Sequence, residues 1–160
     1  MFWIFDPQRK TRKAEADRIY NDLARAALSP ELFTACGVPD TLDGRFEMTS
    51  LYIILAMRGM ERRAAQALFD RFFVGVDRSL REMGIGDLSV PRHMKRMMTA
   101  FNGRRAVYGA ALDSGDAESL KDALRRNLYG TLETPDPAQI EKMAAHVLAR
   151  AQAPQERKAA

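Results

Sequence analysis

The residues best suited to binding chemistry lie in segment 91–112, which contains five arginines and lysines and no Asp or Glu. Methionines and aromatic residues continue through this segment at helical spacing. Methionine is unbranched and polarizable, so a methionine surface adapts to different apolar partners. The segment therefore suits the binding of a hydrophobic segment flanked by charge, such as a nascent peptide. The candidate binding residues are Met94, Met97, Met98, Phe101 and Tyr108, with Arg104 and Arg105 at the rim.

Two other interpretations of this segment stay open. Basic side chains also suit nucleic acid, because phosphate contacts supply salt-dependent affinity. Alternatively, the methionine stripe faces the core of a helical protein while the basic residues face water. Spacing alone favours this second, structural interpretation.

The sequence shows none of the common catalytic motifs. It has no GxSxG, no HExxH and no glycine-rich phosphate loop that follows a strand. Cys36 is the single cysteine, and the two histidines, His93 and His146, are far apart, which excludes a CxxC metal clamp and a disulfide framework. We therefore expect no enzymatic activity, no metal and no cofactor.

The elements that carry these residues are predicted to be helices. The chain has 160 residues, of which 46% are hydrophobic and 29% charged, as in one globular domain. Apolar spacing is helical nearly everywhere, and no segment alternates with a period of two. The predicted fold class is all-α, a single-domain multi-helix bundle over residues 1–160, with loose ends at about 1–6 and 154–160.

Start and stop signals divide the chain into helical segments. Asp6 and Pro7 predict the first helix, and Asp136 with Gln139 resembles a capping box at the last one. A glycine at position 75 allows close packing against another helix. The expected helices cover about 7–28, 30–37, 44–58, 61–83, 91–113, 116–130 and the region after 137.

Two of these segments have further features. Segment 51–57 is apolar on nearly all sides, which predicts the central and most buried helix. After segment 61–83, Gly84, Gly86 and Asp87 predict a structural turn, with Gly84 in a left-handed conformation and Asp87 accepting backbone N–H bonds.

The N-terminus is apolar at Phe2, Trp3 and Phe5, and a basic cluster follows it at 9–13. Five apolar residues are too few for a signal peptide or a membrane span. We therefore expect a cytoplasmic protein. The three aromatic residues either enter a membrane interface while the basic cluster meets anionic lipid, or they cap the core or fray as a mobile terminus. The second interpretation is favoured.

Several motifs resemble one known family. VPDTLDGRF at 38–46 is followed by LREMGIGDL at 80–88, FNGR at 101–104 and YGAAL at 108–112. Their order and spacing resemble the ubiquinol–cytochrome c chaperone family, the assembly factors of the cytochrome bc1 complex, over about residues 20–129. Two positions depart from the family pattern: Gly75 replaces a frequent acidic residue, and Asn102 replaces a common tyrosine.

The resemblance implies a helical, non-catalytic chaperone that binds newly made cytochrome b and assists early assembly of the bc1 complex. It also implies a small partner protein and the ribosome as partners. Together with the N-terminal sequence, it predicts a bacterial protein, peripheral at the cytoplasmic face of the inner membrane. The alternative function is a basic helical module that binds the ribosome or nucleic acid, without a specific nucleic acid sequence.

Overall fold

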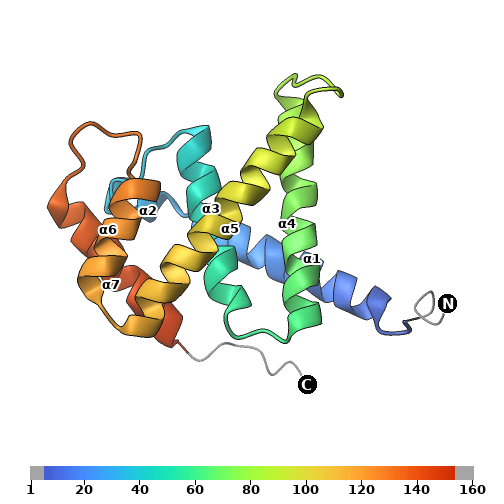
Figure 1. Cartoon of the computed structure of the whole chain (residues 1–160), viewed down its shortest axis with the longest axis horizontal. Coiled ribbons are helices and arrows are strands. Elements are labelled where there is room, and N and C mark those ends of the chain that lie inside the picture. Colours follow the sequence, from blue (N-terminus) through green and yellow to red (C-terminus); the bar gives the residue numbers. More distant parts are fainter. Residues whose placement is uncertain (1–5, 154–160) are drawn as a thin grey trace.

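The computed structural model describes residues 6–153, which contain seven α-helices and no strand (Figure 1). The helices hold 76% of these residues, so the all-α prediction is confirmed. Phe2, Trp3 and Phe5 lie outside the described residues, as do the expected loose segments apart from Asp6. That aspartate is held in place, since its carboxylate contacts Arg12.

The observed helix boundaries agree with the predicted ones to within three residues. The helices are α1 (Arg9–Ala27), α2 (Pro30–Thr34), α3 (Leu42–Met57), α4 (Arg62–Glu82), α5 (Val90–Ser114), α6 (Ala117–Asn127) and α7 (Pro137–Gln152).

Four helices begin at a side chain that accepts a backbone N–H of the first turn. These caps are Thr41, Glu61, Asp116 and Asp136. The predicted start of the first helix is two residues early. Asp6 accepts the N–H of Gln8 at 3.0 Å, so that Pro7 lies in a turn before α1 begins.

Only half of the capping box predicted at the last helix forms, because the side chain of Gln139 makes a different contact. Asp136 does cap α7, through the N–H of Ala138 at 2.9 Å. The side chain of Gln139 instead packs against Gly37, where any Cβ atom would collide with it. Gly37 has a φ of +64°, so glycine suits this position in both respects.

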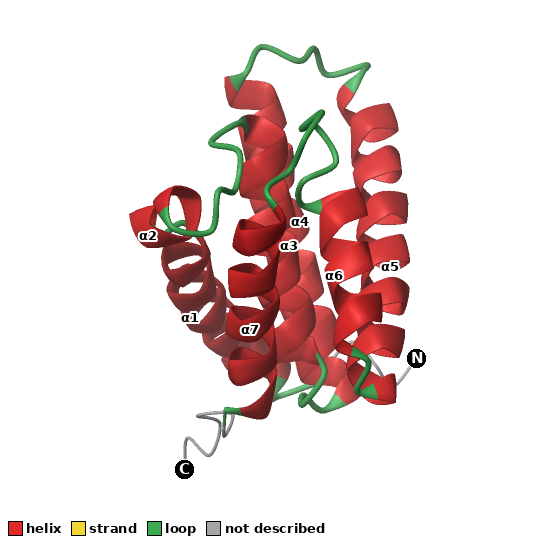
Figure 2. Cartoon of the chain, turned by 90° about the vertical axis from the view of Figure 1, so that its left-hand side faces the viewer, coloured by secondary structure: helices red, strands yellow, loops and turns green. Residues whose placement is uncertain are grey.

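Helix α3 is the central helix, as predicted, with 11 of its 16 residues buried. Helices α1, α4 and α5 pack against it, and Figure 2 shows it enclosed among its neighbours. Because α3 has almost no polar face, the other helices must cover it on every side.

Helices α1 and α4 approach each other closely at Gly75. A Cβ atom at this position would lie 2.6 Å from the Tyr20 hydroxyl of α1, so the glycine provides the space for that ring. Arg71, one turn earlier on α4, forms an ion pair with Asp17 at 2.6 Å and stacks over Tyr20. The close packing predicted at Gly75 is therefore confirmed.

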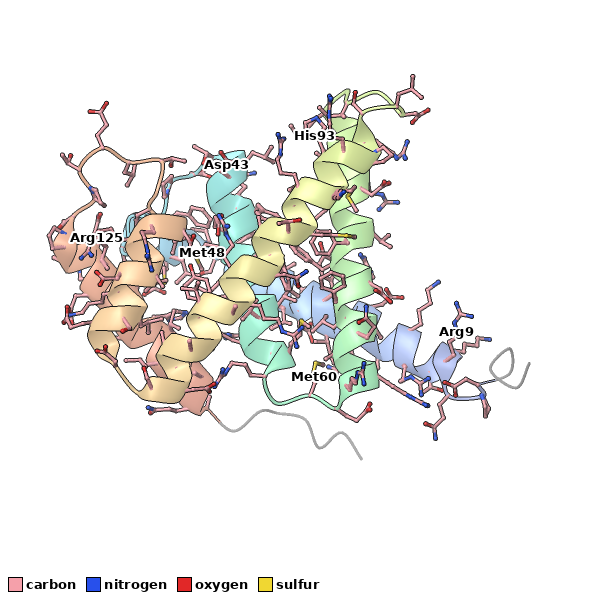
Figure 3. All side chains as sticks on the ribbon, viewed as in Figure 1. Arg9, Asp43, Met48, Met60, His93 and Arg125 are labelled. Atoms are coloured by element: carbon pink, nitrogen blue, oxygen red, sulfur yellow. The ribbon has the colours of Figure 1, made fainter. Side chains whose placement is uncertain are left out.

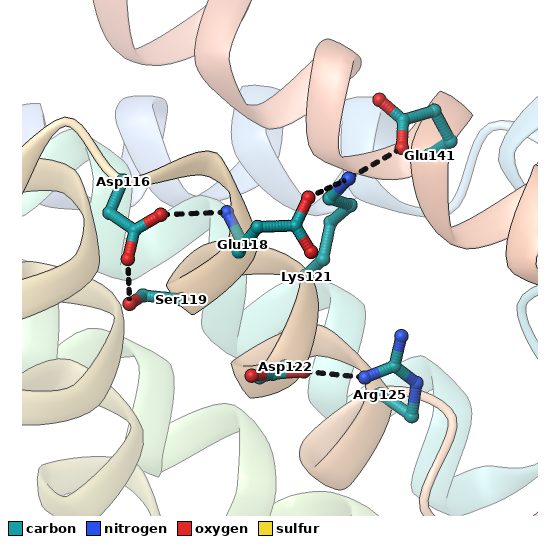
Figure 4. A network of polar contacts seen from close by, with 7 residues as sticks. All are labelled: Asp116, Glu118, Ser119, Lys121, Asp122, Arg125 and Glu141. Atoms are coloured by element: carbon teal, nitrogen blue, oxygen red, sulfur yellow. Dashed lines mark hydrogen bonds and ion pairs between the residues drawn. The ribbon is translucent and has the colours of Figure 1, made fainter.

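Helices α6 and α7 are joined at the surface by a network of charged groups (Figure 4). The Lys121 ammonium contacts Glu118 at 2.5 Å and Glu141 of α7 at 2.8 Å. These hydrogen bonds raise the pKa of Lys121 to about 12. Lys121 therefore stays charged over the physiological pH range and can bridge the two helices.

Helices α4 and α5 form a long antiparallel hairpin whose loop projects beyond the other helices (Figure 1). Four phenylalanine rings hold the two helices together, with ring centroids 4.8 to 5.8 Å apart. They are Phe69, Phe72, Phe73 and Phe101.

The hairpin loop begins with the predicted turn at Gly84. Its φ is +84°, its N–H donates to the carbonyl of Arg81, and the N–H of Ile85 donates to the carbonyl of Leu80. This pair of hydrogen bonds is a Schellman motif, which requires a left-handed residue at this position. The left-handed conformation predicted for Gly84 is therefore confirmed.

The rest of the turn is stabilised differently from the prediction. Gly86 has no positive φ, and its carbonyl accepts the N–H groups of Ser89 and Val90. The Asp87 carboxylate contacts the guanidinium of Arg81 instead of a backbone N–H. This charge pair joins the loop to the last turn of α4.

Replacing the two loop glycines with alanine should have different effects on stability. Gly84→Ala forces a side chain into the left-handed region and should lower the free energy of unfolding by about 1 kcal/mol. Gly86→Ala, with equally open space around it, should be neutral or slightly stabilising. Urea unfolding of both variants measures this difference, and equal effects would contradict the assignment.

Candidate functional site

A groove of about 340 Å³ lies between α4 and α5. It is open to solvent, and its surface is mostly apolar. Two of the predicted methionines contribute to it from α5, and the rest of the lining comes from α4. The lining residues are Phe69, Asp70, Phe73, Val74, Asp77, Met94 and Met98.

The three predicted methionines are all half-buried, but they do not lie together. Met94 and Met98 are one turn apart and both line the groove. Met97 packs against the core and is not among the groove residues. The structure therefore brings two of the three methionines to one accessible surface.

The predicted aromatic residues of α5 lie beneath the surface. Phe101 is 0% exposed, and its ring centroid lies 5.4 Å from that of Phe69 and 5.8 Å from that of Phe73. Tyr108 is also buried, and burial raises its pKa. Phe101 therefore supports the groove from inside, while Tyr108 belongs to the core.

The two predicted rim arginines have different surroundings. Arg104 donates to the carboxylate of Glu47 on α3 through two nitrogens, at 2.5 to 2.9 Å. This hydrogen bonding is the main cause of a raised pKa of Arg104. Both side chains are largely shielded from water, with 25% and 10% exposed, so Arg104 ties α5 to α3.

Arg105, in contrast, is exposed and has no acidic partner among residues 6–153. It follows Met94 and Met98 by eleven and seven residues, spacings that keep it on the same stripe of α5. Its charge is therefore available at the end of the methionine stripe.

The groove also has an acidic edge, which sequence analysis did not identify. Asp70 and Asp77 are seven residues apart, or about 10 Å along α4. Asp77 pairs with Arg81 at 2.9 Å, whereas Asp70 accepts from the Gln66 amide and has no basic partner within residues 6–153. The sequence signal that could have indicated this edge is the i, i+7 spacing of the two acids, which stand next to the phenylalanines of α4.

A second polar cluster joins α7 to α3. The Tyr52 hydroxyl lies 2.7 Å from Nε2 of His146, and the Arg150 guanidinium stacks over the Tyr52 ring at 3.9 Å. Burial, and next the charge of Arg150, lower the pKa of His146. A neutral imidazole can accept a hydrogen bond from the tyrosine hydroxyl, so the cluster stabilises the helix pair at neutral pH.

The described residues offer no arrangement for metal chemistry. Within 6–153, no group of three His, Cys, Asp or Glu side chains lies close enough to hold an ion. Cys36 is buried near α2, and burial raises the pKa of its thiol. Of the helices in this part of the chain, none combines the length and apolar character needed to cross a bilayer.

Comparisons with known proteins identify relatives of the whole domain. A family model described as ubiquinol-cytochrome C chaperone matches residues 34–155. The chain is 38% identical to the Cbp3 homolog from Brucella abortus, whose crystal structure it matches with a TM-score of 0.76 over 94% of this chain and 87% of that one. A comparison with curated proteins finds no match.

The ion pair between Glu47 of α3 and Arg104 of α5 should be important for stability. Glu47→Ala leaves the Arg104 charge without its partner, and we expect the free energy of unfolding to fall by about 2 kcal/mol, less than for a fully buried pair. The control is Asp40→Ala, which breaks the exposed 2.9 Å pair with Arg45 and should cost less than about 1 kcal/mol. Similar losses in both variants would show that burial does not matter here.

Stability should fall as the pH decreases below the ordinary pKa of histidine. The folded protein holds the pKa of His146 below that value, so the unfolded chain binds the proton first, and acid then favours unfolding. Thermal unfolding between pH 7.5 and 5.5, roughly one unit either side of 6.5, measures this loss. His146→Gln should flatten the pH dependence, and His93→Gln, at the half-buried histidine that bonds Arg96, is the matched control.

Proposed function

Because the chain belongs to the ubiquinol-cytochrome C chaperone family, we propose that it binds newly made cytochrome b and assists early assembly of the bc1 complex. The role is non-catalytic and is performed at the cytoplasmic face of the inner membrane of a bacterium. The α4–α5 groove is the client-binding site. Its combination of exposed apolar side chains and an acidic edge is the observation that supports this assignment.

The apolar part of the groove suits a segment of an unfinished membrane protein. Such a segment exposes apolar side chains to water until it is inserted, and burying them on a protein surface is favourable. Val74 is 63% exposed, and Met94 and Met98 are half-buried beside it. The two methionines can adjust to client side chains of different shape.

The acidic edge suits the end of a transmembrane helix. Lys and Arg are enriched in the cytoplasmic loops of membrane proteins, next to the ends of their apolar helices. An apolar helix that lies in the groove would bring such charges toward Asp70 and Asp77 on α4. The site therefore favours the cytoplasmic end of a client helix over its apolar centre.

The size of the groove limits what it holds. A groove of about 340 Å³, lined by side chains from two helices, accepts side chains from one face of one helix. Arg104, Phe101 and Tyr108 are part of the scaffold, since each is engaged within the protein. Met97 likewise supports the site from the core.

The proposal includes the other partners that the family implies. A small partner protein and the ribosome would accompany capture of the client during its synthesis. We assign no surface to either of them.

A charge placed in the groove should prevent client capture without unfolding the protein. Val74→Asp should reduce the cytochrome b that co-purifies with a tagged chain in mild detergent at least about tenfold, because the aspartate must be desolvated against an apolar helix. Val107→Asp is the matched control, since Val107 is an exposed valine on α5 outside the groove. Urea unfolding should show both variants folded.

The acidic edge supplies a second arm of the same experiment. Asp70→Lys should lower capture, and the loss should be reversed when a basic residue at the cytoplasmic end of a client helix is changed to glutamate. Undiminished capture by both Val74→Asp and Asp70→Lys would contradict the groove as the client site. Absence of cytochrome b from the wild-type complex would contradict the choice of client.

A further inference from the structure

The loop that joins α4 to α5 exposes apolar side chains at the end of a projecting hairpin (Figure 1). Leu88 is 99% exposed and Met83 is 53% exposed. A Cβ atom added at Gly84 or at Gly86 would meet no atom of another segment within 4 Å, so the described chain leaves this loop uncovered. Leu88 therefore contributes nothing to the core of the described chain.

Basic side chains surround this apolar loop. Arg92, Lys95 and Arg96 are exposed in the first two turns of α5, and Arg78 is exposed on α4. None of the four has an acidic partner among residues 6–153. Figure 3 shows this end of the hairpin near the labelled His93, whose ring bonds Arg96.

The acidic groups at this end are fewer, and two of them are already paired. Asp77 and Asp87 both contact Arg81, which leaves Glu82 as the acid without a basic partner in the described chain. The hairpin end, residues 77–96, therefore carries five basic and three acidic residues, a net charge of +2.

We propose that this hairpin end docks the protein on an anionic lipid surface. Leu88 and Met83 enter the boundary between headgroups and acyl chains, and the basic side chains of α5 contact lipid phosphates. Apolar side chains surrounded by basic ones are typical of surfaces that bind membrane interfaces, because burial of apolar groups and attraction to anionic lipid act together. Single-stranded RNA is the less suitable partner, since segment 77–96 has no Phe, Tyr or Trp on which bases could stack.

Docking in this way would hold the groove close to the membrane. Asp77 and Met94 both line the groove and lie near the hairpin loop. Asp77 precedes Met83 by six residues, and Met94 follows Leu88 by six. A client helix that emerges from the bilayer would then meet the groove at the lipid surface. The lipid contact itself rests on the hairpin residues and does not depend on which client is bound.

The test is sedimentation of the full-length protein with vesicles of phosphatidylcholine, with or without phosphatidylglycerol. Wild-type protein should bind the anionic vesicles and not the neutral ones. Leu88→Asp should weaken binding several-fold, and the double variant R92E/K95E at least about tenfold, given roughly 1 kcal/mol for each basic residue near an anionic surface.

Two matched controls separate the hairpin end from general charge and hydrophobicity. Leu132→Asp changes an exposed leucine in the loop between α6 and α7, and R62E/R63E reverses two exposed charges at the opposite end of α4. Both controls should bind vesicles as wild type does. Val74→Asp should also bind them normally, so that a failure of the client groove is distinguishable from a failure of lipid docking.

Three outcomes would overturn the proposal. The first is that wild-type protein does not bind anionic vesicles. The second is that binding does not depend on the hairpin end, either because its variants bind like wild type or because removal of residues 1–5 alone abolishes binding. The third is that R92E/K95E loses affinity for single-stranded RNA while vesicle binding is unchanged, which would assign the basic residues to nucleic acid.

Discussion

Helix α3 is apolar on almost every side, and covering it determines how the rest of the chain is arranged. Its one buried carboxylate, Glu47, requires a cation, and Arg104 of α5 supplies it at 2.5 to 2.9 Å. A buried charge without a partner would be strongly unfavourable, so this pair sets the rotation of α5 about its axis. With Arg104 turned toward α3, the stripe that carries Met94 and Met98 is turned toward α4.

The same rotation separates two kinds of surface on the α4–α5 hairpin. Toward α4 the helices enclose an apolar groove with Asp70 and Asp77 at its edge. On the outer side, the start of α5 presents basic groups that no acidic residue of the described chain neutralises. Charged side chains beside exposed apolar side chains help to keep a protein soluble. The two surfaces can therefore serve different partners at once.

Local patterns were sufficient to predict most of the secondary structure. Helix starts at Thr41, Glu61 and Asp116 depend on side chains within three residues, and the turn at Gly84 depends on one hydrogen-bonded motif. The errors occurred where a residue had a competing contact. Gln139 packs against Gly37 of a distant segment, and no property of the local sequence around Asp136 indicates that contact.

The sequence by itself determined that the chain is all-helical, that α3 is central, and that the methionine stripe and the basic residues share one helix. These features depend on spacing within one helix, and spacing is a local property. Only the tertiary structure decided which stripe residues meet solvent. Arg104 and Arg105 are adjacent in sequence, yet one is tied to Glu47, 57 residues away, and the other has no acidic partner among residues 6–153. Likewise, Phe101 is buried and Met98 accessible because the rings of α4 cover one position and not the other, and that depends on how two helices pack.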